Sequence, residues 1–326
     1  ATSLDSGLFS GGKPIMLTIN QAQTVVTGST TEGGIFTLAL QDSSAFDRLT
    51  LTQLRPIDHS NAQTYSGDYM ADVVSLAKEK ISLLVSVKDT DADKDYLLAS
   101  AEIDIGDKIQ FGDDGPGNPS VTLSGTEPIA LTFDGGLSNG NFVGAEGAGD
   151  SNASPTVATV DFKDAFTLGN LQDYGSDGAG STVVSYVLKF ANGFSEGSNS
   201  GLSSGGAAIK LYQDDAGAMI GSTAASEGEI TEGNKVFTIS NAGSVVTLTQ
   251  LNAVDHQTTN TYTGAYLEDL AALSAGKIEL QASASTSDSE GDVSTTKSAA
   301  LDLGGNIKFG DDGPGNPSVT LSGTEP

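Results

Sequence analysis

The sequence predicts an all-β protein made of tandem immunoglobulin-like β-sandwich domains arranged end to end. Short runs of alternating apolar and polar residues recur along the chain, separated by clusters of Gly, Asp, Asn and Ser, which is the pattern of strands joined by turns. About seven such runs in roughly 110 residues are typical of an immunoglobulin-like sandwich. The chain also repeats itself, which indicates more than one copy of the same fold.

The runs that predict strands fall at corresponding places in the two halves of the chain. In the first half they are residues 15–19, 22–27, 34–40, 47–54, 80–88, 96–105 and 107–111. In the second half they are residues 207–213, 218–222, 235–240, 244–251, 277–285, 295–303 and 306–309. Between these sets lie 120–124, 129–133, 157–162 and 182–191. One helical turn is predicted in each half, at Tyr69–Ala77 and at Tyr266–Leu273.

The repeat is visible in the letters of the sequence. Residues 111–128 read FGDDGPGNPSVTLSGTEP and recur unchanged as residues 309–326, which lie 198 positions later. Upstream, Leu51-Thr52-Gln53-Leu54 recurs as Leu248-Thr249-Gln250-Leu251, and Lys80-Ile81 recurs as Lys277-Ile278. We therefore interpret residues 1–128 and 199–326 as two copies of one module, which we call copy one and copy two.

This repeat predicts the domain boundaries. We expect residues 1–112 to form a sandwich that is a partial first repeat, residues 199–312 to form a homologous sandwich, and residues 313–326 to start a further repeat. Residues 113–198 are either a linker with a small β domain of its own or the N-terminal part of the second repeat. Three or four strands make a thin independent core, and both alternatives stay open at this point.

Composition excludes several functional classes. The chain has 326 residues, enough for two or three domains that each bury a core. It has 42 Asp and Glu against 15 Lys and Arg, a formal net charge of -27. Such a field repels nucleic acid and anionic membrane surfaces and attracts divalent cations. We therefore expect no nucleic-acid partner.

The sequence has no cysteine, so disulfides cannot stiffen it and bound metal ions are the expected substitute. No run approaches the roughly 20 apolar residues of a membrane helix, so we expect no membrane insertion. Residue 1 opens no signal peptide. We therefore expect the chain to be a piece of a larger protein.

Alternating carboxylates predict the first candidate metal site. Copy one has the sequence KDTDADKDY, and copy two has TSDSEGDV at the matching loop. The carboxylates concerned are Asp89, Asp91, Asp93 and Asp95 in copy one and Asp288, Glu290 and Asp292 in copy two. Their repulsion is costly without a cation, and calcium takes six to eight such oxygen ligands. The alternative is an acidic hairpin exposed to solvent.

Paired aspartates predict the second candidate site. Asp113-Asp114-Gly115-Pro116 recurs as Asp311-Asp312-Gly313-Pro314 at the end of the last predicted strand of each copy. The simpler interpretation is an ordinary turn, in which aspartate is favoured. The functional interpretation is a calcium site that fixes the angle between neighbouring domains. In an immunoglobulin-like sandwich the last hairpin loop lies at the pole where the preceding linker enters, so the two kinds of site are expected to meet.

The remaining polar residues give weaker signals. Further candidate calcium ligands are Glu127, Glu325, Asp104, Asp107 and Asp302. His59 and His256 each follow an aspartate at the end of a predicted strand, and we expect a structural role because no nucleophile accompanies them. Residues 201–205 read GLSSG, but the predicted context lacks the strand-to-helix turn of a catalytic serine. We therefore expect no enzyme activity.

The order of these motifs resembles a known family. Residues 236–239 read VFTI, and VTLTQL, SDSEGD and IKFGDDGP follow in that order. This series resembles the tandem extender repeat domain of type I-secreted RTX adhesins, which are large surface adhesins of Gram-negative bacteria. Relatives usually carry a D-x-D-G-D loop, which Asp91–Asp95 and Asp288–Asp292 only approximate.

The resemblance implies a structural role outside the cell. The chain would be a monomeric extender segment on the bacterial surface, with calcium as its cofactor and the neighbouring repeats of the same polypeptide as its partners. The alternative is a calcium-dependent carbohydrate- or protein-binding module of the same adhesin, in which loops of residues 129–198 recognise the ligand.

Overall fold

The computed structural model divides into two compact units. It describes residues 3–41, 48–59, 64–65, 72–90, 94, 96–133, 157–176, 178–256 and 270–311. Unit 1 comprises Ala1–Pro119, Asn170–Val183 and Ser285–Thr296, and unit 2 comprises Ser120–Gly169, Val184–Ala284 and Lys297–Pro326. The predicted all-β, sandwich-type fold is confirmed, because the described residues form strands and three short 3₁₀ turns but no α-helix.

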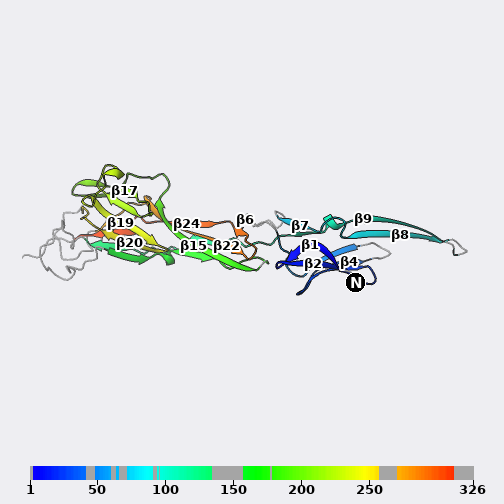
Figure 1. Ribbon diagram of the computed structural model, residues 1–326. Coiled ribbons are helices and arrows are strands. Elements are labelled where there is room, and N and C mark those ends of the chain that lie inside the picture. The colour runs from blue at the N-terminus through cyan, green and yellow to red at the C-terminus, as the bar shows by residue number, and fades with distance from the viewer. Residues whose placement is uncertain are drawn as a thin grey trace, which may run out of the picture. The chain divides into compact units, whose positions relative to one another are not determined.

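Unit 1 is built on a five-stranded antiparallel sheet in the order β1-β2-β3-β4-β5 (Figure 1). The strands are β1 (Leu4–Ser10), β2 (Lys13–Ile19), β3 (Val25–Thr30), β4 (Gly33–Gln41) and β5 (Arg48–Gln53). Two further strand pairs belong to unit 1, β7 (Val73–Ser75) with β10 (Gln110–Gly112) and β8 (Ser82–Thr90) with β9 (Tyr96–Asp104). The 3₁₀ turn η1 (Gly106–Lys108) leads into β10.

Unit 1 also includes β6 (Thr64–Tyr65), β23 (Val293–Ser294) and the end of β22 (Ile278–Asp288). β6 pairs in parallel with β23. The other pairing of β23 is with the end of β22, where Ser287 lies opposite Val293. Residues from both repeats therefore belong to unit 1.

Alternation along the strands places the core of unit 1. Ile15 and Leu17 of β2 point inward with Phe36 of β4, and all three are buried. Phe36 packs against Phe111 with ring centroids 5.0 Å apart. Gly28 lies directly opposite Phe36 on β3, and a Cβ there would come within 2.3 Å of the Phe36 ring. The Phe36 ring therefore packs directly on the backbone of Gly28, where any larger residue would clash with it.

Unit 2 is built on a six-stranded antiparallel sheet in the order β13-β20-β19-β18-β17-β16 (Figure 1). These strands are β13 (Val157–Asp161), β16 (Ser198–Ser204), β17 (Ala207–Gln213), β18 (Met219–Ser222), β19 (Lys235–Ala242) and β20 (Val245–Gln250). The 3₁₀ turns η2 (Lys163–Ala165) and η3 (Glu227–Glu229) connect strands of this unit.

The other pairings of unit 2 bring in the remaining strands. β12 (Ala130–Phe133) is parallel to β25 (Ile307–Gly310), whose other neighbour is β21 (Leu270–Ala272). β22 pairs with β24 (Lys297–Asp302) and with β15 (Ala179–Phe190). β11 (Ser120–Leu123) pairs with β14 (Phe166–Gly169).

The core of unit 2 repeats the arrangement in unit 1. Alternate residues of β22 are buried along its whole length, which is the period of a strand with one face on a core. Phe237 packs against Phe309 with ring centroids 5.0 Å apart, as Phe36 does against Phe111. Gly221 lies opposite Phe237 on the neighbouring strand. The two copies thus share an aromatic pair and a covered glycine.

Replacing Gly221 by alanine is expected to destabilise unit 2 by about 1–3 kcal/mol, the range for overpacking a core. A Cβ at this position would lie 2.4 Å from two ring atoms of Phe237, whose side chain is fully buried. Denaturant unfolding measures the change. Gly228→Ala is the matched control, because nothing lies within 4 Å of a Cβ there. Equal stability of the two variants would contradict the packing described.

The structure corrects the predicted helical turns. The described parts of Tyr69–Ala77 and Tyr266–Leu273 contain the short strands β7 and β21. Each strand pairs with the last strand of its copy, with Val74 opposite Phe111 and Ala271 opposite Phe309. Pairing in a sheet therefore outweighs the helical preference of these short segments.

Residues 120–190 contribute strands to copy two. β12 joins β25, β13 joins β20, and β15 joins β22. In the described part of the chain these three strands pair with strands of copy two, whereas β11 and β14, which also lie within residues 113–198, pair with each other. Both alternatives for residues 113–198 therefore remain predictions.

Candidate functional site

The two kinds of acidic motif meet in unit 1. The exit turn of copy one, which begins at Asp113, and the acidic loop of copy two, residues 288–292, both belong to this unit. Asp89 lies on β8 and is exposed. Asp91, Asp93, Asp95 and Asp312 lie outside the described residues, and Asp311 is half-buried at the end of β25.

The acidic loop is organised around one carboxylate. Oδ1 of Asp288 accepts hydrogen bonds from the backbone N–H groups of Glu290, Gly291 and Asp292 at 3.0, 2.9 and 2.9 Å. The N–H of Asp288 donates to the carbonyl of Asp292 at 3.1 Å. Gly291 has φ +98°, a conformation that glycine adopts without strain. The sequence SDSEGD thus folds into a closed turn.

The second oxygen of Asp288 is the unusual feature of this loop. The residue is 5% exposed, and its Oδ2 is buried without a hydrogen-bond partner. A buried carboxylate oxygen without a partner is costly. A cation next to this oxygen would remove that cost.

The exit turn is fixed by a glycine-containing loop. The Ser176 hydroxyl donates to Oδ2 of Asp114 at 2.5 Å, and the Ser176 N–H donates to the Asp114 carbonyl at 3.1 Å. Gly117 donates its N–H to the Asp173 carbonyl at 3.0 Å. Gly175 has φ +70°, and a Cβ there would lie 2.0 Å from the Asp114 carbonyl oxygen. Only glycine permits this close approach.

Asn118 connects the exit turn to both neighbouring loops. Its carbonyl accepts a hydrogen bond from the Asn170 side chain at 2.9 Å. Its own Oδ1 accepts from the backbone N–H of Thr295 at 3.0 Å. The exit segment of copy one is therefore held within unit 1 by residues that follow it by 52 and 177 positions.

His59 lies between the exit turn and the acidic loop. Its backbone N–H donates to Oε2 of Glu290 at 2.8 Å. Its side chain is 4% exposed, with Nε2 3.3 Å from the Phe111 carbonyl and Nδ1 3.8 Å from Oδ1 of Asp113. Because a carbonyl only accepts, Nε2 carries the hydrogen of that bond. We call Asp58, His59, Asp113, Asp288 and Glu290 the junction cluster.

Burial and like charges act on Glu290 in this cluster. The pKa of Glu290 is raised to about 7, mainly by loss of solvent on burial and also by the nearby Asp58 and Asp288 carboxylates, against the lowering effect of the His59 N–H. The cluster opens to a hollow of about 490 Å³, lined among others by Arg55, Asp58 and Glu290. A cation entering this hollow would meet carboxylates whose charges repel one another.

Glu290→Gln is expected to remove part of the pH dependence of stability in metal-free protein. The pKa of Glu290 is 4.5 in an unfolded chain and about 7 in the folded one. The folded state therefore binds the extra proton, and the free energy of unfolding falls as pH rises from about 4.5 through 7. The variant should match the unaltered chain near pH 4.5 and exceed its stability above pH 7.

Denaturant unfolding in chelator at several pH values measures this difference. Glu102→Gln on β9 is the control, because Glu102 is exposed in the same unit. Parallel pH profiles for the Glu290 variant and the unaltered chain would contradict the charge arrangement of the junction cluster.

Other acidic residues of the two copies have structural partners. Both oxygens of Asp58 accept N–H groups of the β1–β2 turn, from Gly11 and Gly12, and Asp255 binds Gly205 and Gly206 in the same way. Asp104 and Asp302 likewise each bind two backbone N–H groups, at Gly106 and Glu79 and at Gly304 and Gly276. Asp107 pairs with Lys78 and Lys108. Glu127 is exposed, and Glu325 lies outside the described residues.

The sequence interpretation overlooked the position of Asp58 and His59. Both copies carry Asp-His at the corresponding place, but this signal indicated only a structural role. Among the residues that the structure describes, no group of three or more His, Cys, Asp or Glu side chains is arranged to hold a metal ion. The carboxylates of the junction cluster would have to draw closer together to share one.

Comparisons with known proteins give one match. Residues 1–106 and 143–304 match the model of a family described as a domain of unknown function, DUF5801. Neither a curated protein nor a solved structure matches the chain. Within the described residues, no helix has the length and apolar character needed to cross a membrane.

Proposed function

Because the chain belongs to the DUF5801 family, whose description assigns no activity, we propose a role from its own residues. The chain acts as a structural extender, or spacer, in a bacterial surface adhesin, and calcium at the acidic loop and the exit turn makes it rigid. The neighbouring repeats of the same polypeptide are its partners, and it performs no catalytic step. It works outside the cell after type I secretion.

The repeated architecture supports the spacer role. Copies one and two have the same aromatic pair in their cores. Stacked modules that contact only their neighbours give length in proportion to their number. The close approach of Gly175 to the exit turn and the hydrogen bonds of Asn118 support a fixed direction for the chain where it leaves copy one.

The buried Oδ2 of Asp288 is the observation that carries the calcium proposal. Calcium prefers hard oxygen ligands such as carboxylates, and its positive charge would stabilise this buried, negatively charged oxygen. Asp288 and Glu290 would hold the ion, with Asp113 of the exit turn as a further ligand. The raised pKa of Glu290 comes first from burial and then from the neighbouring Asp58 and Asp288 carboxylates, and a bound cation would relieve both effects.

Coupling of metal binding to folding gives the mechanism. Where calcium is scarce, repulsion among the acidic side chains loosens the modules, which suits export through a narrow channel. Outside the cell, calcium near millimolar concentration saturates sites of the extracellular type. Binding to the folded state then stabilises it by mass action.

Small-angle X-ray scattering with calcium and with chelator tests the spacer role. We expect an extended, rigid particle in calcium and a more flexible or more compact one in chelator. Asp288→Asn removes one charge of the acidic loop and should need more calcium for the same profile, whereas Glu102→Gln, an exposed control, should not. Identical profiles in both conditions would rule out stiffening by calcium.

A further inference from the structure

The same positions of the repeat are exposed in copy one and buried in copy two. Residues 49–54 read LTLTQL and residues 246–251 read VTLTQL, so Leu49 corresponds to Val246 and Leu51 to Leu248. Leu49 and Leu51 are 38% and 37% exposed, whereas Val246 and Leu248 are 0% exposed. An apolar face that one repeat covers is therefore open in the other.

The β8 strand shows the same difference. Counting from Lys80-Ile81 and Lys277-Ile278, Val85 and Val87 correspond to Ala282 and Ala284. The two valines are 54% and 62% exposed, whereas the two alanines are 0% and 1% exposed. The valines thus occupy positions that face the core in copy two. Exposed apolar side chains at such positions are unusual in a β-sandwich whose faces are both covered.

Residues 157–190 account for the covered state of copy two. β13 pairs with β20, the strand that corresponds to β5, and β15 pairs with β22, the strand that corresponds to β8. Leu188 of β15 is 1% exposed. In the described residues of copy one, β5 is an edge strand and β8 pairs only with β9, so both strands present a free edge.

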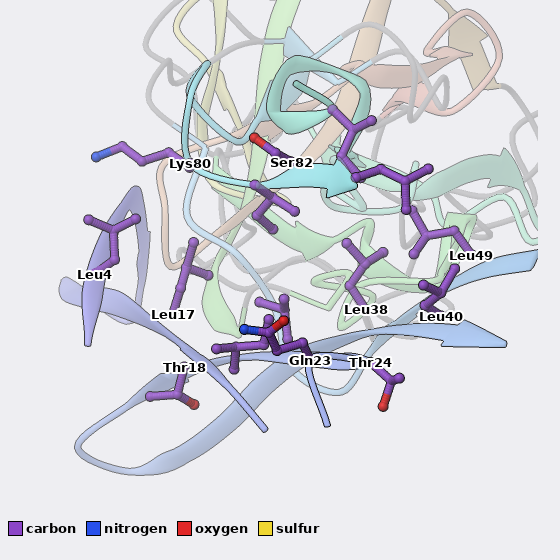
Figure 2. Close-up of a pocket in the computed structure, with 15 residues that line it drawn as sticks. Leu4, Leu17, Thr18, Gln23, Thr24, Leu38, Leu40, Leu49, Lys80 and Ser82 are labelled. Atoms are coloured by element: carbon purple, nitrogen blue, oxygen red, sulfur yellow. The ribbon is translucent and has the colours of Figure 1, made fainter. Parts of the chain in front are cut away.

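A cavity lies between the β1–β5 sheet and the start of β8 in unit 1. It has a volume of about 230 Å³ and is lined mainly by apolar side chains of β2, β4, β5 and residues 80–83. Figure 2 shows Leu38, Leu40 and Leu49 on one side of this cavity, with Lys80 and Ser82 on the segment across it. The cavity, the free edge of β5 and the free edge of β8 together form what we call the open face.

We propose that the open face of unit 1 is the docking site for a further copy of residues 120–190, which completes copy one as the resident segment completes copy two. The register of the resident strand defines the fit. Ala158 of β13 lies opposite Leu248, and Val160 lies opposite Val246. The same register on β5 places Ala158 opposite Leu51 and Val160 opposite Leu49.

This occupant fits the open face better than a peptide of unrelated sequence. Strand pairing satisfies the free backbone groups of an edge, and alternate side chains then set the specificity. The further copy supplies a strand for β5, a strand for β8, and a β12 strand for β10, for which β7 is the one partner among the described residues of copy one. The proposal is independent of calcium binding.

An elongated chain tests the proposal. A further copy of residues 120–194 is joined directly ahead of Ala1 of the full chain, which matches the spacing in copy two, where SGL at 200–202 corresponds to SGL at 6–8. Hydrogen exchange of the β5 and β8 amides is compared in the elongated and the unaltered chain. We expect exchange to slow by about tenfold or more when these edges become paired, with exchange in unit 2 unchanged.

The matched control carries Leu188→Asp in the added copy alone. A charge at this buried position should prevent docking, so exchange of β5 and β8 should return to the rate in the unaltered chain. Unchanged exchange in the elongated chain without this substitution would overturn the proposal. Protection that appears only with dimer formation in analytical ultracentrifugation would also overturn it, because the open face would then be an interface between chains.

Discussion

Replacing Phe309 by alanine is expected to destabilise unit 2 by about 3–5 kcal/mol, the range for removing a buried aromatic ring. Phe309 is 0% exposed and packs against Phe237 at a centroid distance of 5.0 Å. It also lies on β25, between β12 and β21. The cavity would therefore open where three strands meet, and little relaxation can fill it.

Denaturant unfolding, with hydrogen exchange of unit 2 amides to identify the transition, measures this loss. Phe309→Leu keeps more of the volume and should lose less stability. Leu123→Ala is the surface control in the same unit, because Leu123 is 47% exposed, and its effect should stay within about 0.5 kcal/mol. A similar loss for Leu123→Ala and Phe309→Ala would show that Phe309 is not a central core residue.

Leu248→Ala is expected to destabilise unit 2 by about 2–5 kcal/mol, whereas Leu51→Ala should destabilise unit 1 by less than about 1 kcal/mol. The two leucines occupy the same position in the repeat. Leu248 is 0% exposed and lies opposite Ala158 of β13, whereas Leu51 is 37% exposed on an edge strand. The difference therefore reports the cover that residues 157–190 provide.

Hydrogen exchange as a function of denaturant separates the two units and measures both losses in one chain. Thr249→Ala and Thr52→Ala, at the next position of each copy, control for the change of strand propensity. Equal losses for the two leucine variants would contradict the difference between the covered and the open repeat.

Many of the strands were predictable because the alternation of apolar and polar residues is visible within each short segment. Strands such as β2, β4 and β22 alternate apolar and polar residues, and the structure places strands there. β1 and β16 were missed for a physical reason. Both contain a glycine with positive φ, Gly7 and Gly201, at which the strand register shifts. A bulge of this kind interrupts the alternation on which the strand prediction depends.

The partners of residues 120–190 were not predictable from local pattern. β12, β13 and β15 read as strands in the sequence, but whether they pair with each other or with copy two depends on contacts over long distances in the chain. The parallel pairing of β12 with β25 joins residues about 177 positions apart. No alternation pattern specifies such a pairing.

The candidate site was predictable in part. The acidic loop and the exit turn were expected to meet at one pole, and the structure places both in unit 1. The contribution of His59 was not predictable, because its backbone N–H donates the hydrogen bond to Glu290. Every residue except proline has this group, so the residue type does not reveal the bond. For the same reason, the sequence did not predict the hydrogen bonds that Asp104 and Asp302 accept from backbone N–H groups of turns.

Thermal unfolding with calcium and with chelator tests the central claim most directly. Calcium at about 100 times its dissociation constant is expected to stabilise the folded chain by about 2.7 kcal/mol, and Asp288→Asn should reduce the shift in Tm while Glu102→Gln leaves it unchanged. Magnesium at the same concentration should shift Tm less, because it gives up its own water reluctantly. The same Tm in calcium and in chelator would contradict a calcium-dependent spacer.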